Sequence, residues 1–267
     1  MSHRVSIPVL LALAIPAAHA ATCESLATLA LPHTKIDLAE ARPAGEFTLP
    51  GVRPIANLPA FCRVTGALHP SADSDIRFEV WLPQPDKWNS KFQGVGNGGF
   101  AGSITFSGLA DAVRHGYATA STDTGHKDRG ESARWALNHP EKIADFGYRA
   151  IHETAVTAKA VIHAYYGDTL KRSYFNSCSN GGRQALMEAQ RFPDDYDGIL
   201  AGAPGNNRVR LNVGFLWSWL AANGNPGATL PASKLPLLQK AVVSACDELD
   251  GVKDGIIGDP RRAASIR

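Results

Sequence analysis

Hydrophobic and polar side chains alternate along short segments from residue 75 onward, and longer helical segments separate them. Residues 76–82 alternate as a half-buried strand does, and residues 91–95 predict a second short strand. Because strands and helices follow each other in turn, the pattern predicts an α/β fold with a mainly parallel sheet covered on both faces. Further strands are predicted at 117–122, 173–178 and 198–203, and helices at 109–115, 145–166, 182–192 and 208–222.

Two stretches of the chain lack this alternation. Residues 21–72 are rich in Pro, Ala and Leu with little periodicity, so we expect a wrapped, loop-rich segment. From residue 224, prolines precede an amphipathic helix that ends near Cys246, and an Asp/Gly-rich turn follows. We therefore expect one domain over 21–223 and the start of a second subdomain over 224–267.

The first twenty residues have the layout of a secretory signal peptide. Arg4 precedes an apolar run at 5–14, and the small residues Ala18 and Ala20 mark a cleavage site after Ala20. A membrane anchor is the alternative, but the run is much shorter than the roughly 20 apolar residues that cross a bilayer. We expect a secreted or periplasmic protein whose signal peptide spans 1–20.

Composition and charge narrow the possible functions. The 267 residues are 44% hydrophobic and 19% charged, which is typical of a globular protein and excludes a disordered one. The 27 basic and 25 acidic residues give a net charge of +2 without runs of one sign. Neither nucleic acid nor a membrane surface is therefore an expected partner, and a small substrate with little charge fits better.

Four cysteines become informative once export is expected, because disulfides persist outside the cytosol. Cys23 and Cys62 lie in the same N-terminal stretch, and we expect them to pair. Cys178 and Cys246 lie in different contexts, so the even count does not establish that these two meet.

The segment SCSNGG at 177–182 lies between a predicted strand and a predicted helix, which is the context of a nucleophile elbow. Ser179 would be the nucleophile. The residues two before and two after it must be small; Gly181 satisfies this, and Ser177 stands where glycine is usual. The alternative is an ordinary strand-to-helix turn in which Ser179 only caps the helix.

A glycine-rich loop at 96–99 contains candidate groups for the oxyanion hole of such a site. The backbone N–H groups of Gly98 or Gly99, together with that of Asn180, are candidates to stabilise a developing oxyanion. A serine hydrolase of this type also needs an acid and a histidine after the nucleophile. All nine histidines precede Ser179; among them only His126 is a candidate base, and a structural role is favoured for it.

The C-terminal Asp/Gly-rich turn is a candidate metal site. Its oxygen donors recur at short spacings around glycine turns, which suits Ca²⁺ better than a softer metal. The pattern is not that of an EF-hand, and the alternative is two ordinary Asp-Gly turns. The candidate ligands are Asp247, Asp250 and Asp254 with the carbonyl oxygens of Val252 and Ile256.

Five segments form a specific set of motifs. They read GVGNGGFAG (94–102), ASTDTGH (120–126), DFGYRAIHETAVTAKAVI (145–162), SCSNGGRQALMEAQRFPDDYDGILAGAP (177–204) and CDELDGVKDGIIGDPRR (246–262). The chain resembles, from about Cys23 to Arg262, the tannase and feruloyl esterase family of secreted α/β-hydrolases, which includes a hydrolase of mono(2-hydroxyethyl) terephthalate. The resemblance implies an α/β-hydrolase fold.

The resemblance also implies roles for individual residues. Ser179 matches the nucleophile, and Cys178 matches a cysteine that the family bonds to another cysteine directly after the catalytic histidine. Cys23 and Cys62 match a family bridge. Residues 21–223 would be the N-terminal part of the catalytic domain, and 224–267 the start of a lid whose loop holds structural calcium. No organic cofactor is implied.

Family members are considerably longer, and their acid, their histidine and most of the lid would lie beyond Arg267. We therefore expect a C-terminally truncated member. The resemblance implies a carboxylic ester hydrolase that cleaves small aromatic acid esters, such as gallates or ferulates, through Ser179 and an acyl-enzyme. The alternative is a degenerate homologue that at most binds ligand, because no histidine follows Ser179.

Overall fold

The computed structural model describes residues 21–225 and 227–262. The expected signal peptide at 1–20 lies outside the described residues. Contacts divide the chain into two compact units, Met1–Asn206 and Asn207–Arg267. The two units are described separately.

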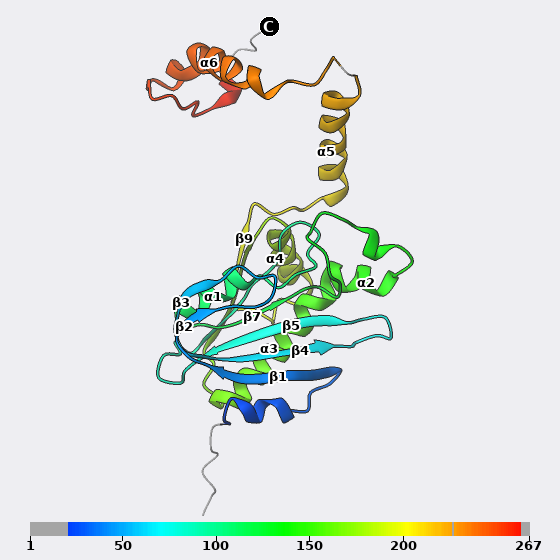
Figure 1. The fold of residues 1–267 in the computed structure, drawn as a ribbon, viewed down its shortest axis with the longest axis vertical. Coiled ribbons are helices and arrows are strands. Elements are labelled where there is room, and N and C mark those ends of the chain that lie inside the picture. Colours follow the sequence, from blue (N-terminus) through cyan, green and yellow to red (C-terminus); the bar gives the residue numbers. More distant parts are fainter. Residues whose placement is uncertain (1–20, 226, 263–267) are drawn as a thin grey trace, which may run out of the picture. The chain divides into compact units, whose positions relative to one another are not determined.

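The first unit is built on a seven-stranded sheet with the strand order β1-β4-β5-β7-β6-β8-β9. Figure 1 labels strands β1, β4, β5, β7 and β9 of this sheet. The first three strands in this order pair antiparallel, as do β5 and β7, whereas β7, β6, β8 and β9 run parallel. A separate hairpin joins β2 and β3. The strands are β1 (Thr34–Arg42), β2 (Gly45–Phe47), β3 (Ile55–Leu58), β4 (Phe61–Leu68), β5 (Ile76–Pro83), β6 (Lys91–Gly94), β7 (Ala118–Thr122), β8 (Arg172–Cys178) and β9 (Gly198–Gly202).

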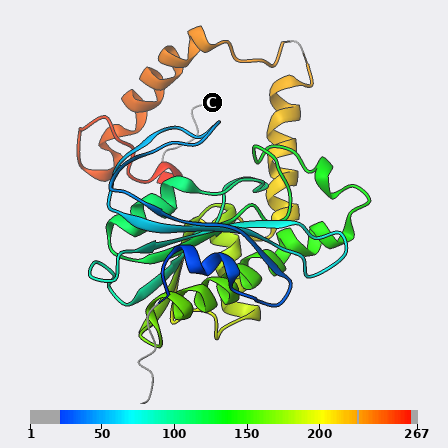
Figure 2. The ribbon, with the colours of Figure 1, turned by 60° about the horizontal axis from the view of Figure 1, so that its bottom comes forward.

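Helices cover both sides of this sheet (Figure 2). The long helix α3 contributes to one apolar cluster with the strands, and α1 contributes to a second cluster with Phe47, Phe61 and Trp81. A π-helical turn leads directly into α3. The helical elements are η1 (Glu24–Thr28), α1 (Phe106–Arg114), η2 (Arg134–Ala136), α2 (Pro140–Ala144), η3 (Asp145–Arg149, the π-helix), α3 (Ala150–Tyr166) and α4 (Asn180–Arg191).

The predicted strands and helices after residue 75 are confirmed with small shifts at their ends. The expectation for residues 21–72 was wrong, because this stretch contains β1 and β4 of the main sheet as well as the β2–β3 hairpin. Strand β4 lies between β1 and β5, and seven of its eight residues are buried. A strand covered on both faces shows no alternation of apolar and polar residues, so the pattern gave no signal there.

The predicted Cys23–Cys62 disulfide is confirmed and ties η1 to β4, with 5.6 Å between the two Cα atoms. The other two cysteines are free thiols, exposed at Cys178 and buried at Cys246. The disulfide closes a loop of 39 residues that contains β1 and the hairpin. It therefore restricts the unfolded chain over this whole segment.

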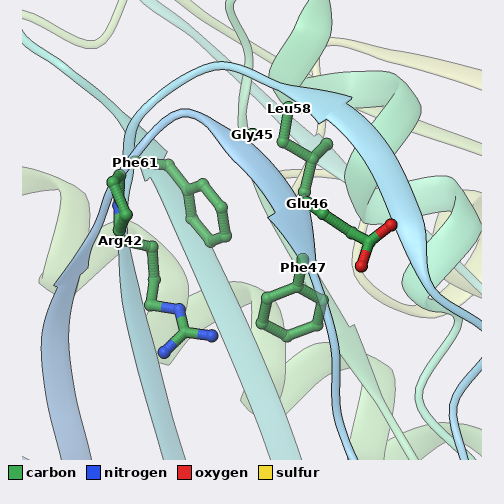
Figure 3. A pocket seen from close by; sticks show the side chains of 7 residues that line it. Arg42, Gly45, Glu46, Phe47, Leu58 and Phe61 are labelled. Carbon is green, nitrogen blue, oxygen red and sulfur yellow. The ribbon is translucent and has the colours of Figure 1, made fainter.

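A small cavity of about 180 Å³ lies beside the β2–β3 hairpin (Figure 3). The guanidinium of Arg42 lies 5.4 Å from the centre of the Phe47 ring, and Phe61 lines the same cavity. Phe61 stacks on the buried Trp81, with 4.4 Å between ring centres. None of the lining residues comes from the segments at 96–99 or 177–182, so this cavity belongs to the packing of the hairpin.

Over its described residues, 207–225 and 227–262, the second unit contains two longer helices and three short turns of 3-10 helix. Helix α5 belongs to this unit by its contacts, whereas the expected domain boundary placed its residues before 224; those domain limits stay a prediction. Among the described residues, no helix combines the length and the apolarity that crossing a bilayer requires. The elements are α5 (Arg208–Asn223), η4 (Ala232–Lys234), α6 (Leu235–Cys246), η5 (Asp247–Asp250) and η6 (Pro260–Arg262).

A buried carboxyl cluster joins α3, α4 and the loop before β9. Glu188 of α4 is fully buried, and burial together with the nearby Asp195 raises its pKa to about 9. Asp195 lies 2.6 Å from Nδ1 of His152, and the ammonium of Lys159 donates to the Asp195 carbonyl oxygen. Burial and the neighbouring carboxyl group therefore both favour the protonated form of Glu188.

Removing the disulfide tests its contribution to stability. We expect the double variant Cys23→Ser/Cys62→Ser to lose about 2–4 kcal/mol of unfolding free energy, because its unfolded chain is less restricted. Urea unfolding followed by circular dichroism measures this, with the exposed thiol variant Cys178→Ser as control. An unchanged urea midpoint in the double variant would show that the pairing of β1 with β4 suffices to hold this segment.

The pKa of Glu188 predicts a pH dependence of stability. Its folded pKa of about 9 lies above the ordinary glutamate value of 4.5, so the folded state binds more protons between these two values. Stability should therefore fall as the pH rises from about 5 to 9, and Glu188→Gln should flatten this decline. Urea midpoints at several pH values measure it, with exposed Glu131→Gln as control. Parallel pH curves for Glu188→Gln and the unaltered protein would contradict the assignment.

Candidate active site

The backbone at Ser179 has the conformation that a nucleophile elbow requires. Strand β8 ends at Cys178 and α4 begins at Asn180, and Ser179 between them has φ 62° and ψ −119°. A positive φ is costly for a residue with a side chain and persists only where neighbours hold it. The Ser179 residue is exposed at this turn.

Three hydrogen bonds hold the Ser179 backbone. Its N–H donates to the carbonyl oxygen of Gly202 at 3.0 Å. Its own carbonyl oxygen accepts from the N–H of Arg183 at 3.1 Å and from that of Gly205 at 2.9 Å. The turn is therefore fixed from α4 and from the segment that follows β9.

Glycines next to the turn allow strand and helix to approach. A Cβ added to Gly181 would lie 1.9 Å from Oγ of Ser177, and one added to Gly182 would lie 2.3 Å from the carbonyl oxygen of Gly202. The side chain of Ser177 thus fills the space that Gly181 leaves. This contact explains why serine is tolerated at the position where glycine is usual.

The glycine-rich loop after β6 packs directly against this turn. A Cβ on Gly96 would lie 3.0 Å from Cα of Gly181, and one on Gly181 would lie 3.3 Å from the Asn97 carbonyl oxygen. Gly98 is exposed, with nothing within 4 Å of the position of a Cβ. Gly99 has φ 54° and faces the carbonyl oxygen of Gly130. The structure thus brings the two predicted segments together.

Arg183 fixes the residue that follows the serine. Its Nε donates to Oδ1 of the buried Asn180 at 2.8 Å. Its two terminal nitrogens donate to the carbonyl oxygens of Gly147 and Phe146, and its guanidinium lies 4.6 Å from the centre of the Phe146 ring. The start of α4 is thereby joined to the π-helical turn η3. The sequence analysis missed Arg183; its signal is a charged residue on the first turn after the elbow.

His126 has a structural environment. Its ring stacks on Trp135 with 3.8 Å between ring centres, and Nε2 lies 2.8 Å from the Phe100 carbonyl oxygen. Nδ1 lies 3.4 Å from the carbonyl oxygen of Thr124, and burial lowers the His126 pKa. A neutral imidazole donates from one nitrogen only, so the ring can donate to one of these two carbonyl oxygens at a time. These contacts join the loop that contains Phe100 to the segment that contains Trp135. Within the described residues, no histidine is hydrogen-bonded to the Ser179 hydroxyl.

The candidate calcium loop has hard oxygen donors, and these carboxylates bond to the loop's own backbone. Oδ1 of Asp247 accepts from the N–H of Gly255 at 2.9 Å. Asp250 and Asp254 accept from the N–H groups two residues later, at 3.0 and 2.9 Å. Within 21–225 and 227–262, no three metal-binding side chains lie close enough together to hold an ion. The donor chemistry fits Ca²⁺, and a bound ion would require the carboxylates to turn inward.

Known proteins match much of this chain. The family model described as tannase and feruloyl esterase matches residues 62–265. An uncharacterized esterase of Xanthomonas campestris pv. campestris is 46% identical over 251 residues, which are 94% of this chain and 43% of that protein. Feruloyl esterase B of Aspergillus niger is 38% identical over 207 residues, which are 77% of this chain and 39% of that protein.

Solved structures agree with the sequence matches. The crystal structure of feruloyl esterase B from Aspergillus oryzae superimposes with a TM-score of 0.83 at 32% identity, over 91% of this chain and 49% of that one. The mixed sheet with its serine turn between β8 and α4 is accordingly an α/β-hydrolase fold. This chain spans less than half the length of these three relatives. The chain belongs to the tannase and feruloyl esterase family.

Proposed function

We propose that this chain carries the nucleophile and the oxyanion-binding segment of a carboxylic ester hydrolase that acts on small aromatic acid esters. The observation that carries the proposal is the Ser179 turn, a costly backbone conformation held by three hydrogen bonds with the glycine-rich loop packed against it. Relatives named feruloyl esterase support ferulate-type esters as the substrate class.

The proposed reaction has two steps. Oγ of Ser179 attacks the ester carbonyl carbon and gives its proton to a base, while the N–H groups of Asn180 and of Gly98 or Gly99 bind the oxyanion. The ester C–O bond then breaks, the alcohol leaves with a proton, and an acyl-enzyme remains. Water attacks this acyl group, releases the acid and restores the serine. No organic cofactor takes part in these steps.

A second candidate function depends on which group would accept the proton of Ser179. Among the described residues, the candidate base His126 is engaged with backbone carbonyl oxygens and is not hydrogen-bonded to Ser179. A chain without a base would bind the ester and turn it over only slowly, through the oxyanion-binding groups alone. The second candidate is therefore a ligand-binding homologue with little or no activity.

Export and metal binding complete the proposal. The signal-like segment at 1–20 and the Cys23–Cys62 disulfide support a secreted or periplasmic protein. The free, exposed thiol of Cys178 is available for the bridge that the family resemblance implies. The loop with Asp247, Asp250 and Asp254 would hold a structural Ca²⁺, with the carbonyl oxygens of Val252 and Ile256 as further ligands.

Replacing the serine tests the reaction. We expect Ser179→Ala to abolish the hydrolysis of methyl ferulate, because the Ser179 hydroxyl is the group that would form the acyl-enzyme, while Ser107→Ala on α1 has no effect. Initial rates of ferulate release measure this. Undiminished hydrolysis by Ser179→Ala would contradict the enzyme proposal. If the unaltered protein and Ser179→Ala bind the ester equally and neither hydrolyses it, the result would favour the ligand-binding homologue.

Calcium titration tests the loop. If the loop binds Ca²⁺, the ion at about 100 times its Kd should add about 2.7 kcal/mol to the stability of the unit that contains the loop. Asp250→Asn should lose most of this gain, whereas Glu248→Gln, an exposed neighbour, should keep it. Calorimetric titration and unfolding with and without EGTA measure both. No heat of binding and an unchanged midpoint would favour the alternative of ordinary Asp-Gly turns.

A further inference from the structure

Two buried amide side chains join the nucleophile helix to the glycine-rich loop. Gln184 of α4 is fully buried, and Asn97 is 4% exposed. Oε1 of Gln184 accepts from the Asn97 backbone N–H at 3.0 Å, and its Nε2 donates to Oδ1 of Asn97 at 3.0 Å. One side chain of the helix thus satisfies both a backbone donor and a side-chain acceptor of the same loop residue.

Asn97 passes this connection on to the rest of the loop. Its Nδ2 donates to the carbonyl oxygen of Ser103 at 2.9 Å and to that of Thr122, at the end of β7, at 2.7 Å. The hydroxyl of Thr105 donates to the Gly96 carbonyl oxygen at 2.8 Å. The residue before Gly98 is therefore fixed from α4, from β7 and from the far end of its own loop.

We propose that Gln184 is a positioning residue that sets where the backbone of Gly98 lies relative to Ser179. The inference rests on the proposed function, since it assigns Gly98 to the oxyanion-binding groups. One bond from the Gln184 amide holds the backbone N–H of Asn97 and the other holds its side chain, and Gly98 follows Asn97 directly. The same bond occupies the Asn97 N–H, so that group does not bind the oxyanion.

The hydrogen bonds of Gln184 indicate a positioning role rather than a role as a side chain that only fills the core. An apolar side chain of similar size would fill the space at Gln184, but it would leave the buried Asn97 N–H without a partner. A Cβ on Gly96 would lie 2.4 Å from Oε1 of Gln184, so the loop approaches the amide as closely as its backbone permits. Oxyanion stabilisation depends on donors that are already in place before the charge develops, which is what such a contact provides.

Gln184→Met in the full chain tests the proposal, with Gln190→Met on the exposed side of α4 as the matched control. A misplaced donor should reduce kcat for methyl ferulate about 100-fold and leave KM within about threefold. Hydrogen exchange of the Asn97 and Gly98 amides should accelerate in Gln184→Met and remain unchanged in Gln190→Met. A wild-type kcat for Gln184→Met, in a protein that Ser179→Ala inactivates, would overturn the positioning role alone.

Gln184→Glu supplies a readout that a merely structural role would not give. Its carboxyl group can donate to Oδ1 of Asn97 only when protonated, so its kcat relative to the unaltered protein should recover as the pH falls. Gln184→Met should show no such recovery. A flat ratio across pH for Gln184→Glu would contradict the proposal.

Hydrolysis that does not depend on Ser179, or no hydrolysis at all, would overturn the proposed function. Hydrogen exchange would then still test whether Gln184 holds Asn97 and Gly98 in place. Faster exchange confined to Asn97 and Gly98 in Gln184→Met would support the contact between Gln184 and this loop. Unchanged exchange, or a uniform increase across the protein, would overturn it.

Discussion

The close approach of α4 to the ends of β8 and β9 is the constraint on which the candidate site depends. Gly181 and Gly182 leave no room for a Cβ, and the serine between strand and helix adopts a positive φ as a result of this approach. The Ser179 N–H donates to the Gly202 carbonyl oxygen, and the Ser179 carbonyl oxygen accepts from the Gly205 N–H; these bonds hold the turn in that conformation. The backbone of neighbouring segments therefore exposes the serine, and its side chain needs no partner to be presented.

Local patterns predicted the part of the molecule that carries the site. Alternation, glycine clusters and the short spacing around Ser179 identify parallel strands, the elbow and the loop, because each is determined by residues close together in the chain. Strand β4 was missed because nearly all of its residues are buried, so apolar and polar positions do not alternate along it. Gln184 was missed because its role depends on Asn97, 87 residues earlier. The contact appears only after the fold brings the two segments together.

The antiparallel half of the sheet contributes to stability, and the parallel half positions the candidate site. Strands β1, β4 and β5 form the antiparallel half, in which β4 and β5 are largely buried, and the Cys23–Cys62 disulfide ties β4 to the N-terminal segment. The parallel strands end at the glycine-rich loop and at the Ser179 turn, where α/β proteins place their ligands. A change in the first half therefore acts on stability, whereas a change at the ends of the second half acts on the geometry of the site.

Helix α4 connects these two kinds of effect. Gln184 and Glu188 lie four residues apart, so both occupy the buried face of the helix. One reaches the glycine-rich loop, and the other lies in the carboxyl cluster with Asp195. Deprotonation of Glu188 would place a charge inside that cluster and strain the packing of α4 against α3. The same helix begins at the elbow, so the packing of its buried face bears on the elbow and on the loop contact together.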